Sequence, residues 1–183
     1  MKIQGFFPTG VLFHQVPSQL SNQIESLIIP KLNYLERKDE TYTDYYKKRI
    51  IEINEIKGLV TEIEKCVMFY ANEIKVEPKP ISNYWVQNYS IGDTHSRHNH
   101  GRSLFSIVYW VRANNNAGNL VIYDPSPYRG VWGDPYCTSP YSTNKVFITP
   151  KKGLLTMFQG YVEHEVLPGG EGCERTIIAF NIG

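Results

Sequence analysis

The sequence of 183 residues lacks the features that mark secreted, membrane-bound or nucleic-acid-binding chains. Its three cysteines, Cys66, Cys137 and Cys173, form no C-x-x-C pair and are odd in number, which argues against a disulfide framework and indicates a reducing, cytoplasmic location. No apolar run approaches the roughly 18 residues of a membrane span, and no signal-type segment opens the chain. The net charge of +1 gives no electrostatic reason to expect a nucleic acid or an anionic membrane as a partner.

The composition that is present belongs to an ordinary globular protein, with 42% hydrophobic and 20% charged residues. The length suits one domain with a proper core and is short of two well-sized domains. Pro78 and Pro80 separate a helical part from a strand-rich part, but no linker-like tract or repeat lies there. We therefore predict a single domain over residues 1–183, with a helical lead-in and opening strand in 1–80 and the core in 81–183.

The lead-in contains one opening strand and two helices in our interpretation. The strand lies within residues 2–16, and a first helix begins near Ser18 and is kinked or ended by Pro30. A clearer helix is predicted over residues 54–74, where apolar residues recur three and four positions apart. Its apolar face is expected to pack across a sheet.

From Ile81 onward the sequence changes to short stretches rich in β-branched and aromatic residues, separated by turn signals such as N-N-N-A-G and P-G-G-E-G. Close spacing of so many short strands predicts an antiparallel sandwich or jelly roll. The fold class is therefore mainly β with flanking helices. The expected strands lie in residues 81–89, 103–112, 119–124, 145–150, 154–159, 163–168 and 175–182.

The residues that carry chemistry gather in the stretch Y-S-I-G-D-T-H-S-R-H-N-H, residues 89–100. His98 and His100 are two positions apart, so on an extended strand both side chains leave from the same face. Two imidazoles that converge in this way are well suited to a divalent metal. The pair is a weak signal alone, because histidines at this spacing also occur in ordinary strands.

Taken with Tyr89 and Gly92 before it and with His164 and Arg175 after it, the pattern resembles the 2-oxoglutarate- and iron(II)-dependent oxygenases. The resemblance covers residues 84–182 and is closest to short oxygenases of bacteria and phages, whose sequences run W-x-N-x-Y-x-x-G…H-x-H…S-x-V-Y-Y. It implies a double-stranded β-helix, or jelly roll, and a dioxygenase that couples decarboxylation of 2-oxoglutarate to hydroxylation of a C–H bond. Fe(II), 2-oxoglutarate as co-substrate and O2 are implied with it.

The resemblance implies a metal held by His98, His100 and His164. Most members of the family have H-x-D, and here His100 occupies the position of the aspartate. Three neutral imidazoles leave the site one negative charge short of the usual set. The alternative is that Asp93 or Asp124 supplies a carboxylate ligand.

The resemblance also assigns the co-substrate site. Arg175 and Asn181 share one face of the last expected strand by alternation, and a buried guanidinium needs an anionic partner, which the C5 carboxylate of 2-oxoglutarate supplies in the family. Tyr89 matches a position whose hydroxyl helps to bind the co-substrate. Asn181 and Tyr109 are weaker candidates for the same pocket. The alternative for Arg175 is a surface arginine paired with a nearby glutamate.

The prime substrate, a protein side chain or a small molecule, is not legible in the sequence, nor is the oligomeric state. The segment 125–140 is long, aromatic and studded with proline and glycine, and its Tyr128, Trp132 and Tyr136 are expected to form a wall that faces the substrate. His95, in a run that looks like a loop, is a candidate for the substrate entrance.

Two other functions fit parts of the pattern. Gly92, His98 and His100 also match the opening G-x5-H-x-H of a cupin motif, although the glutamate that this motif requires four or five residues later is absent. A non-catalytic jelly-roll binding module, with structural histidines, is the other alternative.

Overall fold

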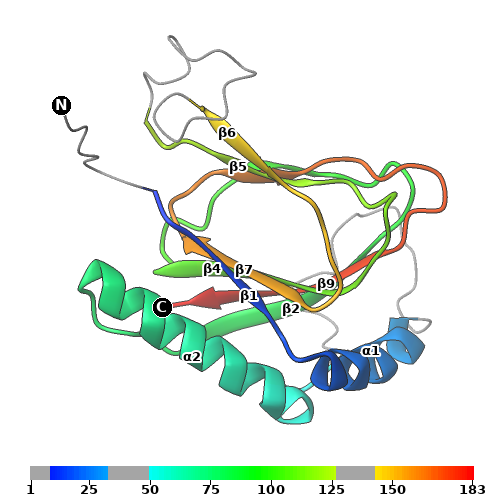
Figure 1. Ribbon diagram of the computed structural model, residues 1–183, viewed down its shortest axis with the longest axis horizontal. Helices are drawn as coiled ribbons and strands as arrows, with labels where there is room; N and C mark the ends of the chain where they lie inside the picture. Colours follow the sequence, from blue (N-terminus) through cyan, green and yellow to red (C-terminus); the bar gives the residue numbers. More distant parts are fainter. Residues whose placement is uncertain (1–8, 33–49, 127–142) are drawn as a thin grey trace.

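A computed structural model describes residues 9–32, 50–126 and 143–183, which Figure 1 draws in colour. Two antiparallel sheets face each other, a five-stranded sheet in the order β1-β7-β4-β9-β2 and a four-stranded sheet in the order β3-β8-β5-β6. This arrangement confirms the predicted fold class. The strands are β1 (Val11–Gln15), β2 (Ile81–Tyr89), β3 (His95–His98), β4 (Phe105–Ala113), β5 (Leu120–Tyr123), β6 (Lys145–Ile148), β7 (Leu154–Gln159), β8 (His164–Val166) and β9 (Arg175–Ile182).

Two helices, α1 (Ser18–Leu32) and α2 (Lys57–Ile74), cover the outer face of the five-stranded sheet (Figure 1). A short 3-10 helix, η1 (Ile53–Ile56), leads into α2, so the helix predicted over 54–74 is confirmed apart from its first turn. In α1 the helix runs two residues past Pro30. None of the helices in the described segments has the length and apolar content that crossing a membrane would need.

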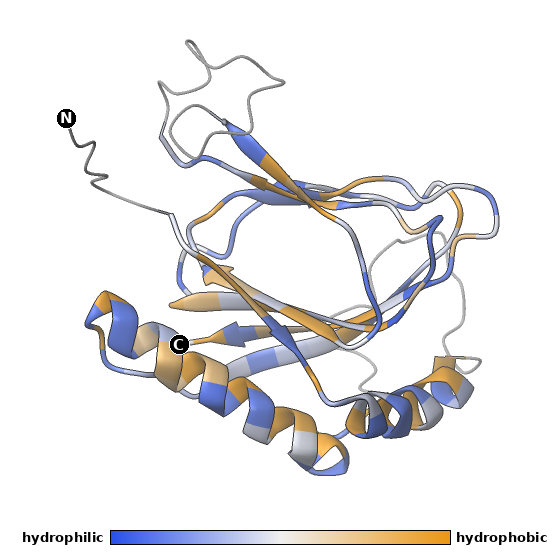
Figure 2. Cartoon of the chain, viewed as in Figure 1, coloured by the Kyte–Doolittle hydropathy of each residue, from blue (hydrophilic) through white to orange (hydrophobic). Residues whose placement is uncertain are grey.

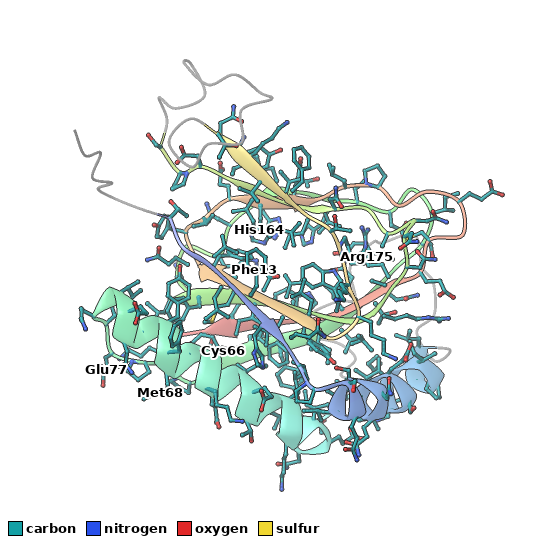
Figure 3. All side chains as sticks on the ribbon, viewed as in Figure 1. Phe13, Cys66, Met68, Glu77, His164 and Arg175 are labelled. Carbon is teal, nitrogen blue, oxygen red and sulfur yellow. The ribbon has the colours of Figure 1, made fainter. Side chains whose placement is uncertain are left out.

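The apolar spacing of α2 determines which of its sides meets the sheet. Leu59, Ile63 and Val67 recur at intervals of four and are buried, and Cys66 is only 6% exposed. Figure 3 shows Cys66 on the sheet side of the helix and Met68 on the opposite side, where it is 49% exposed. Such a helix packs on a sheet by its buried stripe.

Alternation along the central strands divides the apolar residues between two clusters, and Figure 2 shows the apolar colouring of the strands of both sheets. In β4, Phe105, Tyr109 and Val111 belong to the cluster between the sheet and the helices. Val108 and Trp110 belong to the cluster between the two sheets. Because successive side chains of a strand leave from opposite faces, the second set points toward the space where the candidate site lies.

The opening strand of the chain is part of this frame. β1 pairs with β7 along its whole length and forms the edge of the five-stranded sheet. One strand, β3, is absent from the sequence-based prediction: residues 95–98 look like a loop in the sequence but pair with β8 in the four-stranded sheet.

Candidate active site

The four-stranded sheet brings three histidines together. His98 lies opposite His164 in the antiparallel pair of β3 and β8, and His100 follows two residues after the end of β3. The ring centroids of His98 and His164 are 4.2 Å apart, and those of His100 and His164 are 5.3 Å apart. One donor atom from each ring lies within 4.8 Å of the other two. Two nitrogens bound to one ion at about 2.1 Å are at most about 4.2 Å apart, so the three rings would have to move closer together to share an ion.

Backbone carbonyls orient two of these rings. Nδ1 of His98 lies 2.6 Å from the Ser96 oxygen, and Nδ1 of His164 lies 3.1 Å from the Val162 oxygen. Since a carbonyl only accepts, each Nδ1 carries the proton and donates it, which leaves Nε2 with a lone pair. Metal-binding histidines commonly have this second hydrogen bond, which fixes the ring and its tautomer.

The site keeps its imidazoles neutral. Burial, followed by the proximity of the other imidazoles, lowers the pKa of His164 to about 3 and that of His100 to about 4. Burial also lowers the pKa of His98, against a raising effect of its hydrogen bond to Ser96. Neutral imidazole is the form that binds a metal, so protons do not compete for these ligands near pH 7.

A glycine fixes the segment that carries His100. The N–H of His100 donates to the Gly160 oxygen at 2.7 Å, and the N–H of Gly160 donates to the Leu104 oxygen at 3.1 Å. A Cβ atom on Gly160 would lie 2.1 Å from the Ser103 oxygen and 2.7 Å from the His100 oxygen. Only glycine therefore allows the two backbone segments to approach this closely.

Neither alternative carboxylate joins the three histidines. Asp93 Oδ2 accepts a hydrogen bond from the Ser90 N–H at 2.6 Å, and Asp124 Oδ1 accepts one from the Ser126 N–H at 2.9 Å. Both carboxylates thus serve local turns. In the described residues, the group of potential metal ligands consists of imidazoles alone.

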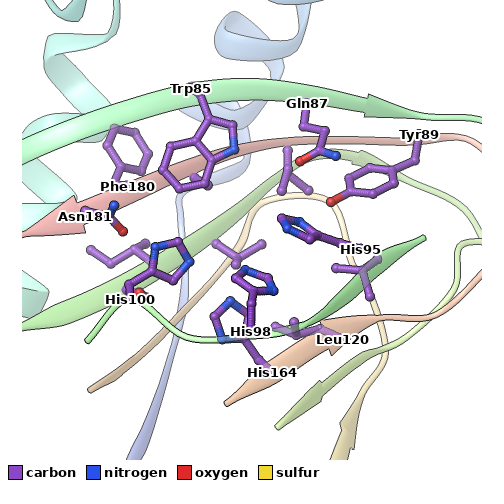
Figure 4. A pocket seen from close by; sticks show the side chains of 16 residues that line it. Trp85, Gln87, Tyr89, His95, His98, His100, Leu120, His164, Phe180 and Asn181 are labelled. Atoms are coloured by element: carbon purple, nitrogen blue, oxygen red, sulfur yellow. The ribbon is translucent and has the colours of Figure 1, made fainter. Parts of the chain in front are cut away.

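A pocket lies between these histidines and the inner face of the five-stranded sheet (Figure 4). Its atom-free space is about 360 Å³, part of it open to solvent. Trp85, Gln87 and Tyr89, at alternate positions of β2, enter it from the sheet side. His95 also lines the pocket and is only 9% exposed, with its ring stacked on that of His98 at a centroid distance of 3.9 Å. It is thus part of the pocket wall.

Arg175 is buried at one end of the space between the sheets, with 1% of its surface exposed (Figure 3). Its Nη1 donates to the Gly118 oxygen at 2.8 Å and to the Leu167 oxygen at 3.0 Å, and its Nη2 donates to the Asp93 oxygen at 3.1 Å. Its guanidinium carbon lies 3.9 Å from the ring centroid of Tyr89. This burial rules out the surface arginine that the sequence left as an alternative.

Two N–H groups of the Arg175 guanidinium donate no hydrogen bond within the described residues. A guanidinium carries five N–H donors, and the three hydrogen bonds above leave two, one of them on Nε, which has no acceptor in the described parts of the chain. All three acceptors are neutral carbonyls, and no salt bridge to Arg175 occurs among the described residues. Burial lowers the pKa of Arg175, with Tyr89, Cys173 and Asp93 acting in the opposite direction. A buried cation of this kind favours an anionic ligand.

Two further predicted residues, Asn181 and Tyr109, lie on opposite faces of the five-stranded sheet. Asn181 lines the pocket, near His100 (Figure 4). Tyr109 does not: its side chain belongs to the cluster beneath the helices, on the opposite face of the sheet, which corrects its assignment to the co-substrate pocket. Tyr128, Trp132 and Tyr136 lie outside the described residues.

Sequence reasoning missed several residues of the pocket wall, among them Trp85 and Gln87. The signal was present, because both lie at even spacing from Tyr89 on an expected strand, and even spacing places side chains on one face. The register of β2 against β9 confirms the geometry: Trp85 is opposite Ala179, Gln87 opposite Ile177 and Tyr89 opposite Arg175.

Comparison with known proteins gives a family match. A family model described as "Putative 2OG-Fe(II) oxygenase" matches residues 83–181, more than half of the chain. No curated protein matches the sequence.

Solved structures match the fold at low sequence identity. A prolyl-4-hydroxylase from Pseudomonas putida has a TM-score of 0.64 and 12% identity, with 95% of this chain and 92% of that one covered. A prolyl hydroxylase from Trichoplax adhaerens, in complex with a peptide fragment of the hypoxia inducible factor oxygen degradation domain, has a TM-score of 0.63, 14% identity and coverages of 95% and 84%. The non-heme alpha ketoglutarate dependent epimerase SnoN from nogalamycin biosynthesis has a TM-score of 0.62, 9% identity and coverages of 95% and 78%.

Proposed function

The chain belongs to the 2OG-Fe(II) oxygenases, and from this premise we propose that His98, His100 and His164 hold its Fe(II) while Arg175 and Tyr89 receive its 2-oxoglutarate. The protein is a dioxygenase that depends on Fe(II) and 2-oxoglutarate, as the resemblance implied. The observation that carries the residue assignment is the meeting of three neutral imidazoles with a buried arginine that lacks an anionic partner in the described structure.

The donor set fits the metal in number and in chemistry. Imidazole is a good ligand for iron, and a set of three protein ligands on one side leaves positions open for co-substrate and O2. The hydrogen bonds of Nδ1 in His98 and His164 support coordination through Nε2. When bound, Fe(II) would activate O2, the oxidant, whose reduction would take two electrons from the decarboxylation of 2-oxoglutarate to succinate and two from the hydroxylation of a substrate C–H bond.

In this proposal the residues around the metal position 2-oxoglutarate and exclude water from it. The two free N–H donors of Arg175 would hold the distal carboxylate of 2-oxoglutarate, and the ring of Tyr89 would keep water from the guanidinium face that it covers. The apolar surface of β9 between Arg175 and Asn181, with Ile177 and Ala179 on the pocket side, would exclude water from the path between the co-substrate and the metal.

The substrate is a protein side chain or a small molecule in this proposal. The peptide bound by the prolyl hydroxylase from Trichoplax adhaerens supports the first class, because that protein shares this fold. A reducing, cytoplasmic setting is part of the proposal and is supported by Cys66 and Cys173, both free. A single domain over residues 1–183 stays a prediction, supported by the packing of α2 on the sheet that contains β9.

The experiment is consumption of 2-oxoglutarate and release of succinate by the purified protein, with and without Fe(II) and O2. We expect turnover only when all three are present, and less than about 1% of it in His164→Ala, because loss of a ligand exceeds the 10- to 100-fold effects of residues that merely support ligands. His14→Ala is the matched control, since His14 lies on β1 and pairs with Glu62 away from the pocket. Wild-type protein that binds neither Fe(II) nor 2-oxoglutarate would refute the assignment.

A further inference from the structure

Two polar side chains at the far end of the pocket have hydrogen-bonding atoms that nothing in the described structure satisfies. Ser106 is only 3% exposed, and its Oγ has no hydrogen-bond partner there. Asn181 Oδ1 is also buried and without a partner. Both residues line the pocket, and they lie opposite each other in the register of β4 and β9. Directly opposed residues have Cβ atoms about 5 Å apart, so the two groups form a pair.

This pair is too far from Arg175 to serve the same ligand, so in this proposal Asn181, a candidate for the co-substrate pocket in the sequence, belongs to a different ligand. Six residues of β9 separate Asn181 from Arg175, a distance of roughly 20 Å along a strand that rises about 3.3 Å per residue. The five-carbon chain of 2-oxoglutarate spans only about 5 Å between its carboxyl carbons, given C–C bonds of about 1.5 Å. A co-substrate anchored on Arg175 therefore leaves the end of the pocket at Asn181 and Ser106 free for another molecule.

The surroundings of the pair define the chemistry of that molecule. Trp85 forms one wall and stacks on His100 at a centroid distance of 5.9 Å, which places this end next to a proposed metal ligand (Figure 4). Phe180 and Val108 add apolar surface, and the pocket wall formed by the described residues contains no carboxylate, lysine or arginine side chain. No side chain of this wall would neutralise a charged group, and the proposed ion beside His100 would repel a cation, so the side chains of this end suit an uncharged ligand.

The pair requires a hydrogen-bond donor from its ligand and can satisfy an acceptor on the same ligand. Asn181 Oδ1 accepts, and the Ser106 hydroxyl donates or accepts. A planar carboxamide offers an N–H and a C=O side by side and carries no charge. Ligands that lack such groups would leave two buried polar atoms unsatisfied, which weakens their binding.

We propose that Ser106 and Asn181 bind an uncharged carboxamide of the prime substrate and so determine its specificity. The inference rests on the proposed function, because the reacting C–H bond must lie beside the metal. The carboxamide holds the neighbouring carbon of the substrate next to His100, with Trp85 covering its apolar part.

The probe is propionamide, compared with propionate and propylammonium, which are similar in size but carry opposite charges. The protein is loaded with Mn(II) and 2-oxoglutarate without O2, and the enhanced relaxation of the probe's methyl protons reports binding near the metal. We expect propionamide to bind at least about 5-fold more tightly than either ion, a ratio that corresponds to one satisfied hydrogen bond. A blocked glutamine peptide is then compared with propionamide. Tighter binding of the peptide indicates a protein substrate and equal binding indicates a small molecule, and both results support the carboxamide class.

Variants separate recognition from folding and from metal binding. Asn181→Leu and Ser106→Ala are each expected to weaken propionamide binding about 5-fold while Mn(II) and 2-oxoglutarate affinities, measured by calorimetry, stay unchanged. Asn181→Asp is expected to reverse the preference toward propylammonium. Thr156→Val is the matched control, because its Oγ1 is also buried without a described partner but Thr156 does not line the pocket.

Several results would overturn the inference. Equal binding of the three probes, or full propionamide binding in both variants, excludes recognition by the pair. A loss of Mn(II) affinity in Asn181→Leu that matches the loss of probe binding would instead make Asn181 a positioning residue for His100. Failure of the wild-type protein to bind Mn(II) or 2-oxoglutarate at all would refute the proposed function, and the inference with it, and calorimetry detects this case separately.

Discussion

The guanidinium of Arg175 lies 3.9 Å above the ring centroid of Tyr89, and the two residues are direct register partners in the pairing of β9 with β2. The ring covers one face of the cation, and three backbone carbonyls occupy part of its edge. A cation that is buried and covered in this way is desolvated, which strengthens its attraction for a carboxylate. From this contact we derive the first prediction.

Arg175→Gln is expected to reduce the affinity for 2-oxoglutarate by about 30-fold or more, because hydrogen bonds to a charged group contribute about 2–3 kcal/mol. Mn(II) affinity should change little, since Arg175 is not among the proposed ligands. Calorimetry of both ligands, with a thermal melt to verify folding, tests this. Arg112→Gln is the control, because Arg112 is a partly exposed arginine that pairs with Glu174. Unchanged 2-oxoglutarate binding in a folded Arg175 variant would contradict the assignment.

His100→Asp is expected to give an active site with tighter Fe(II) binding. The three histidines contribute no negative charge, and a carboxylate in place of His100 restores the two-histidine, one-carboxylate set typical of these oxygenases. Fe(II) affinity, measured by competition with a chelator, should rise several-fold, with 2-oxoglutarate turnover retained. His100→Ala, which removes the ligand without replacing it, should lose both properties. Loss of iron binding in the aspartate variant would indicate that the backbone admits only an imidazole at this position.

Gly118→Ala is expected to displace the backbone carbonyls that accept hydrogen bonds from Arg175. A Cβ at position 118 would lie 2.0 Å from the Leu167 oxygen, an acceptor of the Arg175 guanidinium, and 2.5 Å from the Pro168 oxygen. The backbone must move, at a cost of about 1–3 kcal/mol in the free energy of unfolding. Weaker 2-oxoglutarate binding should accompany the lower stability in urea titrations.

Gly170→Ala is the matched control, since the nearest atoms to a Cβ there are 4.0 Å away. Equal effects of the two substitutions would show that the loops tolerate the displacement and that Arg175 does not depend on it.

The free energy of unfolding is expected to fall as the pH rises above about 9. Burial raises the pKa of the Cys66 thiol to about 11 and that of the Tyr70 hydroxyl to about 12, above their ordinary values of 9.0 and 10.0. At a pH between the unfolded-state and folded-state pKa of either group, the folded state binds more protons than the unfolded state. The contribution of these groups to the free energy of unfolding is therefore fully present below about pH 9 and is lost as the pH rises through the folded-state pKa values. The loss between pH 7.5 and 10.5 should be on the order of 2 kcal/mol in urea titrations.

Cys66→Ala distinguishes this mechanism from general alkaline damage. The variant starts from a lower stability because it loses buried volume, but its pH dependence should be clearly shallower. An unaltered slope would mean that the thiol is not the group responsible.

The sequence was sufficient to predict strands with a clear run of apolar residues, and to predict which side chains of a strand share a face. β7 and β9 begin and end where the pattern of apolar residues predicts. Asn181 lines the pocket, and Arg175, on the same face of β9 by alternation, is buried against the Tyr89 ring. β3 could not be found in this way, because H-S-R-H is short and polar and becomes a strand only through its pairing with β8.

Tyr109 illustrates a second limit of the sequence. Its strand, β4, is buried at seven consecutive positions. The apolar pattern therefore does not show which residues face the helices and which face the other sheet. Likewise, His98 and His164 are 66 positions apart, and only the register of β3 and β8 brings them together. The spacing of His98 and His100 suggested a metal site. The third histidine of the proposed set, His164, could be predicted only from the family resemblance, because periodicity does not show which strands pair.

β9 carries both Arg175 and Asn181, and it is paired on both sides, with β4 and with β2. Strand β9 therefore sets the distance between Arg175, which we propose binds the co-substrate, and Asn181 at the opposite end of the pocket. Because side chains alternate along a strand, inserting or deleting one residue within β9 would turn Arg175 or Asn181 away from the cavity, whereas exchanging side chains would leave their spacing unchanged.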